Sequence, residues 1–231
     1  MKRIAIVGAG GFAREVAWML EDISASAERE TDRYVTAGFL VSDLSHIGSY
    51  DSPALGDFSW LESNHVDALA MGIGTPAVRL KLAEELKARF PYIAWPALVH
   101  PSVIWQRRTM EIGEGATICA GSIATVNVRF EPFCMVNLTC TIGHEAVIGR
   151  GSVLNPTVNI SGGVELGSGV LVGTGAQILQ YVKVGDGATI GAGAVVTKYV
   201  DAGATVVGIP AKELIKKPAI DAVPAAVSTA A

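Results

Sequence analysis

The sequence has few charges and no long apolar run, and these shortages exclude several classes of protein. Only 17% of the 231 residues are charged, the formal net charge is -4, and no run of Lys or Arg is longer than two. A nucleic-acid backbone or an anionic membrane surface requires clustered basic residues, so neither is expected as a partner. No apolar run approaches the roughly 20 residues that span a bilayer. The first eleven residues, MKRIAIVGAGG, lead on without the small-residue cleavage site of a secretory signal, so a cytoplasmic protein is expected.

Cysteine and histidine are scarce as well, which limits metal and redox chemistry. The three cysteines, Cys119, Cys134 and Cys140, lack zinc-ligand spacing with histidine, so buried thiols in a reducing compartment are expected. The four histidines are His46, His65, His100 and His144. A zinc centre of the three-histidine type would need more histidines than the single one in the repeat described next, and no metal is predicted.

A six-residue repeat dominates the second half of the sequence. From residue 112 to residue 201 the chain divides into fifteen hexads in unbroken phase, with an apolar first position and Ala, Ser, Val or Cys at the fifth. A period of six suits a short strand followed by a turn, and three such units make one coil of a β-helix, which predicts five coils. Two further hexads, 99–104 and 105–110, precede them out of phase. Gly and Asn at second and fourth positions are expected to supply the positive φ or the close approach that corners need. Examples are Gly143, Gly149, Asn155, Gly167 and Gly173.

The first 98 residues follow a different pattern, in which strands and helices alternate. We expect strands in 3–11, 34–41 and 65–74 and helices in 12–22 and 75–90, the second begun by Thr75 and Pro76. Alternation of this kind predicts a small parallel α/β domain with a Rossmann-like arrangement. The expected organisation is therefore an α/β domain over 1–98, a β-helix over 99–217 and a flexible tail over 218–231.

The first expected strand runs into a glycine turn that could hold phosphate. Gly8, Gly10 and Ala13 match the G-x-G-x-x-G/A pattern at the start of a helix, where backbone N–H groups and the helix dipole attract anions. The same glycines could serve only a tight turn. Val41 and Ser42 stand where a dinucleotide site would have a ribose-binding carboxylate, so a mononucleotide, such as the diphosphate of a nucleotide sugar, fits better.

His144 is the residue of the repeat whose chemistry most needs an explanation. It occupies the third position of its hexad and faces outward, with Glu145 beside it. An eighteen-residue coil places Gly162 one strand spacing above it, which brings a backbone N–H within reach. The same step stacks Asn137 under Asn155. A lone outward histidine can also be an ordinary solvated residue, but the carboxylate, the glycine and the amide ladder together favour a catalytic base.

With these motifs assembled, the chain resembles the bacterial sugar acetyltransferases related to sialic acid O-acetyltransferase and to the N-acetyltransferases of nucleotide-linked amino sugars. The motifs are IVGAGGFAREV, GIGTPAVR, VHPSVI, TIGHEAVIG, SGGVELG, VGTGAQI, IGAGAVVTK and VVGIPAK. The resemblance implies a left-handed parallel β-helix, acetyl-CoA as co-substrate and a homotrimer that binds CoA between neighbouring β-helices.

The resemblance also assigns roles to individual residues. It implies that His144 is the general base, that Glu145 supports it, that Asn137 orients the acceptor and that the Gly162 N–H holds the thioester oxygen. Residues expected along the pantetheine path are Thr174, Gly191 and Ala192. Residues expected at the nucleotide sugar are Gly10, Gly11, Phe12 and Gly74. The sequence departs from the family where many relatives have histidine in place of Phe12 and of Val153.

Three functions are carried forward from the sequence. The first is acetyl-CoA-dependent N-acetylation of a nucleotide-linked amino sugar by direct attack, since no cysteine is placed as a nucleophile. The second keeps the mechanism but acetylates a sugar hydroxyl, as in O-acetylation of a sialic acid. The third is a trimeric scaffold without catalysis, which would not bind acetyl-CoA.

Overall fold

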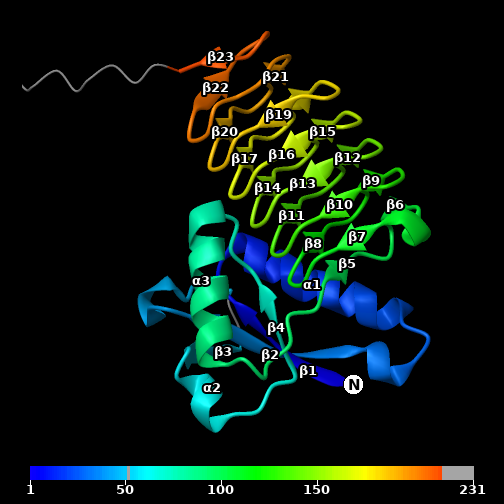
Figure 1. Cartoon of the computed structure of the whole chain (residues 1–231). Helices are drawn as coiled ribbons and strands as arrows, with labels where there is room; N and C mark the ends of the chain where they lie inside the picture. The colour runs from blue at the N-terminus through cyan, green and yellow to red at the C-terminus, as the bar shows by residue number, and fades with distance from the viewer. Residues whose placement is uncertain (51–52, 215–231) are drawn as a thin grey trace, which may run out of the picture.

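The structure is a computed structural model that describes residues 1–50 and 53–214. An α/β domain lies at one end of a parallel β-helix (Figure 1). Both parts of the expected fold are therefore confirmed, and the tail expected over 218–231 lies outside the described residues.

The N-terminal domain is built on a parallel sheet with the strand order β3-β2-β1-β4. Its strands are β1 (Lys2–Val7), β2 (Tyr34–Val41), β3 (Ala54–Asp57) and β4 (Ala68–Met71). The central strands are apolar along consecutive residues, because helices cover both faces of the sheet and both sets of side chains are buried.

The helices of this domain are α1 (Gly11–Ser26), α2 (Trp60–Ser63) and α3 (Pro76–Arg89), with 3-10 turns η1 (Glu30–Asp32) and η2 (Leu44–His46). Helix α1 packs on one face of the sheet through Val16 and Leu20, and α3 packs on the other through Leu82 and Leu86. As predicted, α3 begins with Pro76 after Thr75. Strand β3 and helix α2 were not predicted, since each is only four residues long and neither shows a full period of apolar positions.

The β-helix consists of three sheets whose strands pair in parallel and recur every eighteen residues along most of its length, so each coil contributes one strand to each sheet. The docked sheet lies against the N-terminal domain and contains β5 (Leu98–Val99), β8 (Thr117–Ile118), β11 (Met135–Val136), β14 (Val153–Leu154), β17 (Leu171–Val172), β20 (Thr189–Ile190), β22 (Thr205–Val207) and β23 (Lys212–Glu213). The last strand of the docked sheet, β23, instead pairs antiparallel with β22.

The second sheet is here named the uncharged sheet, after its outward residues. It contains β6 (Ile104–Trp105), β9 (Ile123–Ala124), β12 (Thr141–Ile142), β15 (Asn159–Ile160), β18 (Gln177–Ile178) and β21 (Val195–Val196). The third, the charged sheet, contains β7 (Glu111–Ile112), β10 (Arg129–Phe130), β13 (Val147–Ile148), β16 (Glu165–Leu166) and β19 (Lys183–Val184). Its outward residues form ion pairs from coil to coil, between Arg129 and Glu111 and between Lys183 and Glu165.

The hexads 99–104 and 105–110 also belong to the β-helix, as predicted. Strands β5 and β6 pair with β8 and β9 of the next coil. The 3-10 turn η3 (Arg107–Thr109) lies between β6 and β7, in the hexad that precedes the extra residue Glu111.

The interior of the β-helix follows the hexad rule. First and fifth positions form one continuous apolar cluster from Val103 to Val206, and fifth-position serines are buried within the hydrogen-bonded wall. Positive φ occurs at the fourth position of the hexads, whereas the second-position glycines are needed for close approach alone. A methyl group on Gly143, for example, would lie 2.5 Å from the backbone N of Gly162. Of the two roles expected for corner residues, the second-position glycines thus serve close approach, and positive φ falls to the fourth position.

Three edges join the three sheets, and each has its own character. The histidine edge follows the uncharged sheet and carries Asn127, His144, Glu145, Gly162, Gly163 and Tyr181. The asparagine edge follows the docked sheet and carries Asn137, Thr139, Thr157, Thr174, Gly191 and Ala192. The docked edge follows the charged sheet and carries Gly115, Phe133, Gly151 and Gly169.

The N-terminal domain is fixed to the docked edge by a buried arginine. Arg79 of α3 is fully buried and donates hydrogen bonds to the carbonyls of Phe133 (2.7 Å) and Ile73 (2.6 Å) and, more weakly, to those of Met71 and Cys134. Burial lowers the pKa of Arg79 to about 10, so it stays protonated at neutral pH. The guanidinium therefore joins the end of β4 to the backbone of the β-helix, and no carboxylate of the described residues pairs with it.

Candidate active site

The imidazole of His144 lies directly against Gly162, which belongs to the next coil. An alanine methyl at residue 162 would lie 2.4 Å from Nε2 of His144 and 2.5 Å from its Cε1. Such distances are far below van der Waals contact, so only glycine leaves room for the ring in this position. The side chain of His144 is 54% exposed, which leaves its outer face open to a substrate.

The backbone around Gly162 leaves one hydrogen-bond donor free beside this ring. The Gly163 N–H donates to the His144 carbonyl at 2.8 Å, and the Tyr181 N–H donates to the Gly162 carbonyl at 3.0 Å. The Gly162 N–H has no acceptor within residues 1–50 and 53–214. A free N–H one coil above a histidine is the arrangement that can receive an oxygen on which negative charge develops.

Glu145 lies on the Nδ1 side of the same ring. Its Oε2 is 3.7 Å from Nδ1 of His144, which is an ion-pair distance rather than a hydrogen-bond distance. A carboxylate there stabilises an imidazolium by charge attraction, and it leaves Nε2 as the nitrogen nearer Gly162. Glu145 also has a positive φ of 62°, a conformation that costs a non-glycine residue energy and that is over-represented at functional sites.

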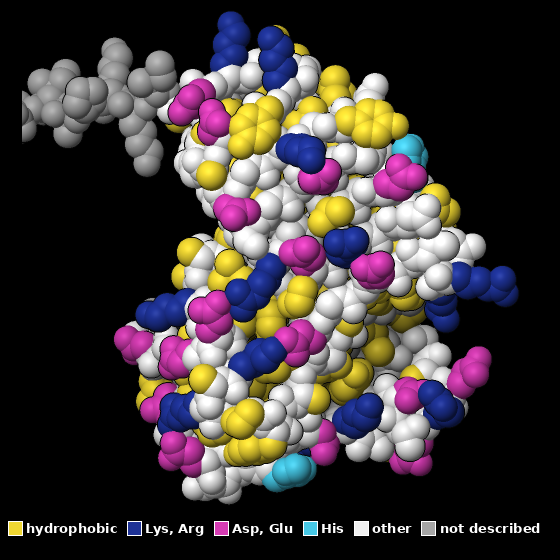
Figure 2. Space-filling model, in the orientation of Figure 1, with side chains coloured by type: hydrophobic (Ala, Val, Ile, Leu, Met, Phe, Trp, Pro, Cys, Tyr) yellow, Lys and Arg dark blue, Asp and Glu magenta, His cyan; other side chains and the backbone are white. Residues whose placement is uncertain are grey.

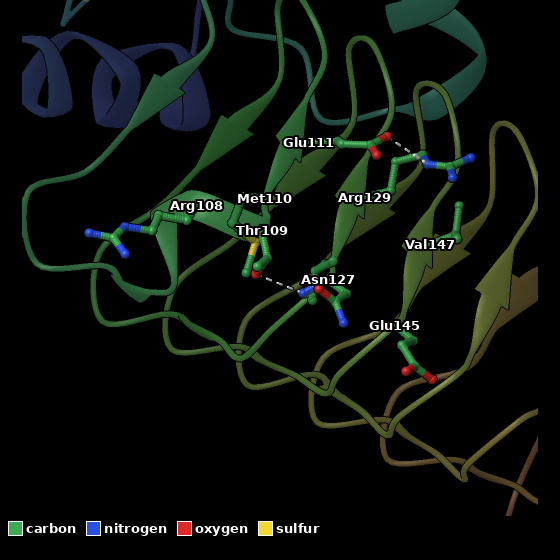
Figure 3. Close-up of a pocket in the computed structure, with 9 residues that line it drawn as sticks. Arg108, Thr109, Met110, Glu111, Asn127, Arg129, Glu145 and Val147 are labelled. Atoms are coloured by element: carbon green, nitrogen blue, oxygen red, sulfur yellow. Dashed lines mark hydrogen bonds and ion pairs between the residues drawn. The ribbon is translucent and has the colours of Figure 1, made fainter.

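A cavity of about 490 Å³ opens on the coils below Glu145 (Figure 3). It lies between the histidine edge and the charged sheet and is lined by Arg108, Thr109, Met110, Glu111, Asn127, Val128, Arg129, Glu145 and Val147. The Asn127 N–H donates to Thr109 Oγ1, and Arg129 pairs with Glu111, as the dashed lines show. Asn127, Arg108 and Arg129 were not among the predicted site residues. The sequence offered one indication of this cavity: Asn127 is a non-glycine residue at a fourth position, where positive φ costs it energy.

The other residues expected along the β-helix lie on the asparagine edge, across the uncharged sheet from His144. Asn137 is almost buried, and its Oδ1 accepts the Leu138 N–H at 2.7 Å. Thr174, Gly191 and Ala192 follow on higher coils of the same edge. Within one chain these residues and His144 therefore lie on different edges of the β-helix.

The glycine turn forms a third location, in the N-terminal domain. Gly10 has a φ of 97°, and the space beside Gly10, Gly11 and Gly74 is open to at least 4 Å. Phe12 instead packs against the core under α1. A separate cavity of about 220 Å³ lies at the carboxyl ends of the strands and is lined by Gly8, Ala9, Val41, Ser42, Phe58, Ile73, Val78 and Leu82.

The three cysteines are buried, and His100 lies between the two domains. Burial raises the pKa of Cys119 and Cys134 to about 12 and that of Cys140 to about 11, which keeps all three as neutral thiols. His100 contacts Asp22 of α1 at 3.0 Å and so joins the two domains. Of the described residues, no cluster of three or more His, Cys, Asp or Glu is arranged to hold a metal ion.

Comparison with known proteins places this geometry in a family. Residues 3–86 match the PglD N-terminal domain, and residues 163–198 match the bacterial transferase hexapeptide repeat. The acetyltransferase domain of PglB from Neisseria gonorrhoeae, solved with acetyl coenzyme A, is 26% identical, with a TM-score of 0.80 over 92% of this chain and 99% of that one. WeeI from Acinetobacter baumannii is 28% identical, with a TM-score of 0.78 over 93% of this chain and 100% of that one. The chain thus combines a PglD-type N-terminal domain with bacterial transferase hexapeptide repeats, and it is similar to acetyltransferases, which supports an acyltransferase.

A third structure extends the likeness of the fold. PerB from Caulobacter crescentus, solved with CoA and GDP-perosamine, is 24% identical and superposes with a TM-score of 0.81 over 93% of this chain and 98% of that one. A search of curated proteins found no match. No helix in the described part of this acyltransferase is long and apolar enough to cross a membrane. Its expected site residues thus lie at three places on one chain: the histidine edge, the asparagine edge and the glycine turn.

Proposed function

We propose that this acyltransferase uses acetyl-CoA to N-acetylate the amino group of a nucleotide-linked amino sugar. The observation that carries the proposal is the imidazole of His144 over Gly162, with a free N–H at Gly162 and an open outer face. Support for the substrates comes from PglB, solved with acetyl coenzyme A, and from a perosamine N-acetyltransferase solved with CoA and GDP-perosamine.

The proposed reaction is a direct transfer in one active site. Nε2 of His144 takes a proton from the acceptor nitrogen as that nitrogen attacks the thioester carbonyl carbon. The carbonyl oxygen becomes negative and accepts a hydrogen bond from the Gly162 N–H, while Glu145 stabilises the imidazolium. Collapse of the tetrahedral intermediate breaks the carbon–sulfur bond, and the proton leaves His144 for the departing thiolate of CoA.

The acceptor fits the cavity below Glu145, and the donor fits the coils above His144. The cavity is lined by guanidinium groups, carboxylates and an amide, which suit a sugar with hydroxyl groups and a nearby phosphate. The edge above His144 offers the free N–H of Gly162 beside the imidazole, where the thioester oxygen can accept a hydrogen bond. In this arrangement His144 stands between the two substrates.

A homotrimer would bring the three separate locations together. A neighbouring chain that packs against the uncharged sheet can place its asparagine edge and its glycine turn beside the histidine edge of the first chain. The outward residues of the uncharged sheet support this, because they carry no charge: Ile104, Ile123, Thr141, Asn159, Gln177 and Val195. Ile104 is 66% exposed in the single chain, which is an apolar surface that an interface would cover.

Charge placed on the uncharged sheet tests this assembly. Thr141→Glu should give monomers in size-exclusion chromatography with light scattering, and acetyl transfer should fall with the trimer. Lys183→Glu, which changes charge on the charged sheet, is the control and should leave the trimer intact. A monomeric wild-type chain with full activity would contradict the proposed arrangement.

A thiol-release screen tests the reaction itself. Purified protein and acetyl-CoA are incubated with amino-sugar nucleotides, the same nucleotides with a hydroxyl in place of the amine, and free sugars. Fast release of CoA with the amines alone is the expected result. Preference for the hydroxyl compounds would indicate O-acetylation instead. No release with any acceptor, together with no saturable acetyl-CoA binding in calorimetry, would indicate a scaffold.

A further inference from the structure

Tyr181 stands on the histidine edge directly above the proposed active site. It follows β18 at the fourth position of its hexad, two coils above Glu145 and one coil above Gly163. Its backbone N–H donates to the Gly162 carbonyl at 3.0 Å. Tyr181 is therefore attached to the same peptide segment that carries the proposed oxyanion donor.

The ring of Tyr181 closes the space over Gly163, as the imidazole of His144 closes the space over Gly162. A methyl group on Gly163 would lie 2.4 Å from Cδ1 of Tyr181 and 2.6 Å from its Cε1. Consecutive Cα atoms are about 3.8 Å apart, so the two rings cover neighbouring positions on one strand of backbone. One ring comes from the coil below and the other from the coil above.

The backbone conformation of Tyr181 is strained, and neither burial nor a hydrogen bond of its side chain in the single chain offsets this strain. Its φ is 61°, a left-handed conformation that costs a non-glycine residue about 1–2 kcal/mol. The residue is 68% exposed, and its hydroxyl has no hydrogen-bond partner within residues 1–50 and 53–214. Neither burial nor a hydrogen bond explains a tyrosine where Gly163 occupies the equivalent position of the preceding coil. Non-glycine residues in this conformation are over-represented at functional sites.

We infer that the Tyr181 ring is the wall of the acyl subsite and limits the length of the acyl group that is transferred. This rests on the proposed function, in which the thioester carbonyl lies at the Gly162 N–H. From there a two-carbon acetyl group ends short of the ring over Gly163. Each further methylene extends the chain toward the flat ring, which lies against the backbone at Gly163.

Acyl-length selectivity of Tyr181→Gly is the test. Glycine adopts the local φ without strain, so the variant should fold at least as stably as the wild type. One methylene in a pocket of fixed size changes selectivity by roughly 10–200-fold. We therefore expect the ratio of kcat/KM for butyryl-CoA to that for acetyl-CoA to rise by about tenfold or more in the variant.

Two further variants separate the effect of the ring from that of its hydroxyl group and of a nearby aromatic side chain. Tyr181→Phe keeps the ring and should keep the wild-type ratio, whereas loss of selectivity in this variant would assign the limit to the hydroxyl and overturn the inference. Tyr199→Ala removes the exposed aromatic of the next coil and should also keep the ratio.

The outcomes distinguish this inference from the proposed function. If the wild type transfers acetyl groups and Tyr181→Gly keeps the wild-type ratio, only the acyl-wall inference fails. The same holds if the variant changes the oligomeric state in size-exclusion chromatography but not the ratio, because Tyr181 would then be an interface residue. If the wild type transfers no acetyl group to any acceptor, the proposed function fails.

Discussion

The histidine edge and the docked edge have the same backbone and opposite roles. Both repeat every eighteen residues, and both adopt positive φ at the fourth position of the hexad. On the docked edge that position is glycine in every coil except at Phe133, whose ring packs against Trp95 of the N-terminal domain. On the histidine edge it is Asn127, Glu145, Gly163 and Tyr181 in successive coils.

The difference teaches how one repeat supports two kinds of surface. Glycine on the docked edge lets α3 approach, as Leu80 does at Gly151 and Gly169, and the edge is buried up to Gly151. Side chains on the histidine edge carry the backbone strain but remain open to solvent. Figure 2 shows the β-helix standing clear of the N-terminal domain over much of its length, with charged side chains on the visible face. Stability is therefore expected to depend on the first edge and activity on the second.

Loss of the imidazole should give the largest change. His144→Ala should lower kcat for acetyl transfer by about 10²–10⁴-fold, since it removes the general base, and should leave the thermal unfolding midpoint nearly unchanged. Thiol release with the best acceptor and circular dichroism measure the two quantities. The control is His65→Ala, an exposed histidine of the N-terminal domain. Wild-type activity in His144→Ala would contradict the expectation that activity depends on the histidine edge.

Loss of the buried guanidinium should instead lower the stability of the fold. Arg79→Met leaves the carbonyls of Phe133 and Ile73 buried without donors, so the free energy of unfolding should fall by about 3–5 kcal/mol. Urea titration followed by fluorescence measures this. Should Arg79→Met unfold at the same urea concentration as the wild type, the docked edge would not be the stabilising one.

A matched pair of glycine substitutions compares the two edges directly. Gly162→Ala displaces the imidazole of His144, and third-position alanine is compatible with the backbone, as at Ala192. We expect kcat to fall by about tenfold or more, with little change in stability. Gly151→Ala combines a φ of 65° with a contact on Leu80 and should cost about 1–3 kcal/mol of stability. Equal effects of the two changes on activity would show that the edges are not distinct.

Removal of an exposed ion pair should give the smallest change. Lys183→Met breaks the pair with Glu165 on the charged sheet, where both side chains are more than half exposed. Solvent screening limits such a pair to less than about 1 kcal/mol of stability. A larger loss in urea titration would mean that the charged sheet, and not only the docked edge, stabilises the β-helix.

Much of the fold was predictable because it depends on residue types that repeat at short, fixed spacings in the sequence. The apolar first position and the small fifth position of each hexad fix which side chains face the interior, and the eighteen-residue step follows from three hexads per coil. The placement of Gly162 over His144 came from the same arithmetic and is confirmed by the contact between them. Positive φ at the fourth position was harder to assign, since Glu145 and Tyr181 stand where glycine is usual.

The sequence by itself determined the repeat, the glycine turn and the stacking of Gly162 on His144, because each depends on residues at fixed short spacings. Only the tertiary structure decided that Arg79 joins the domains across 54 residues of sequence. It alone showed the cavity under Glu145 and the ring of Tyr181 over Gly163. These features depend on which corner of the prism each hexad turns and on where α3 docks. Contacts between distant segments decide both, and no local period records them.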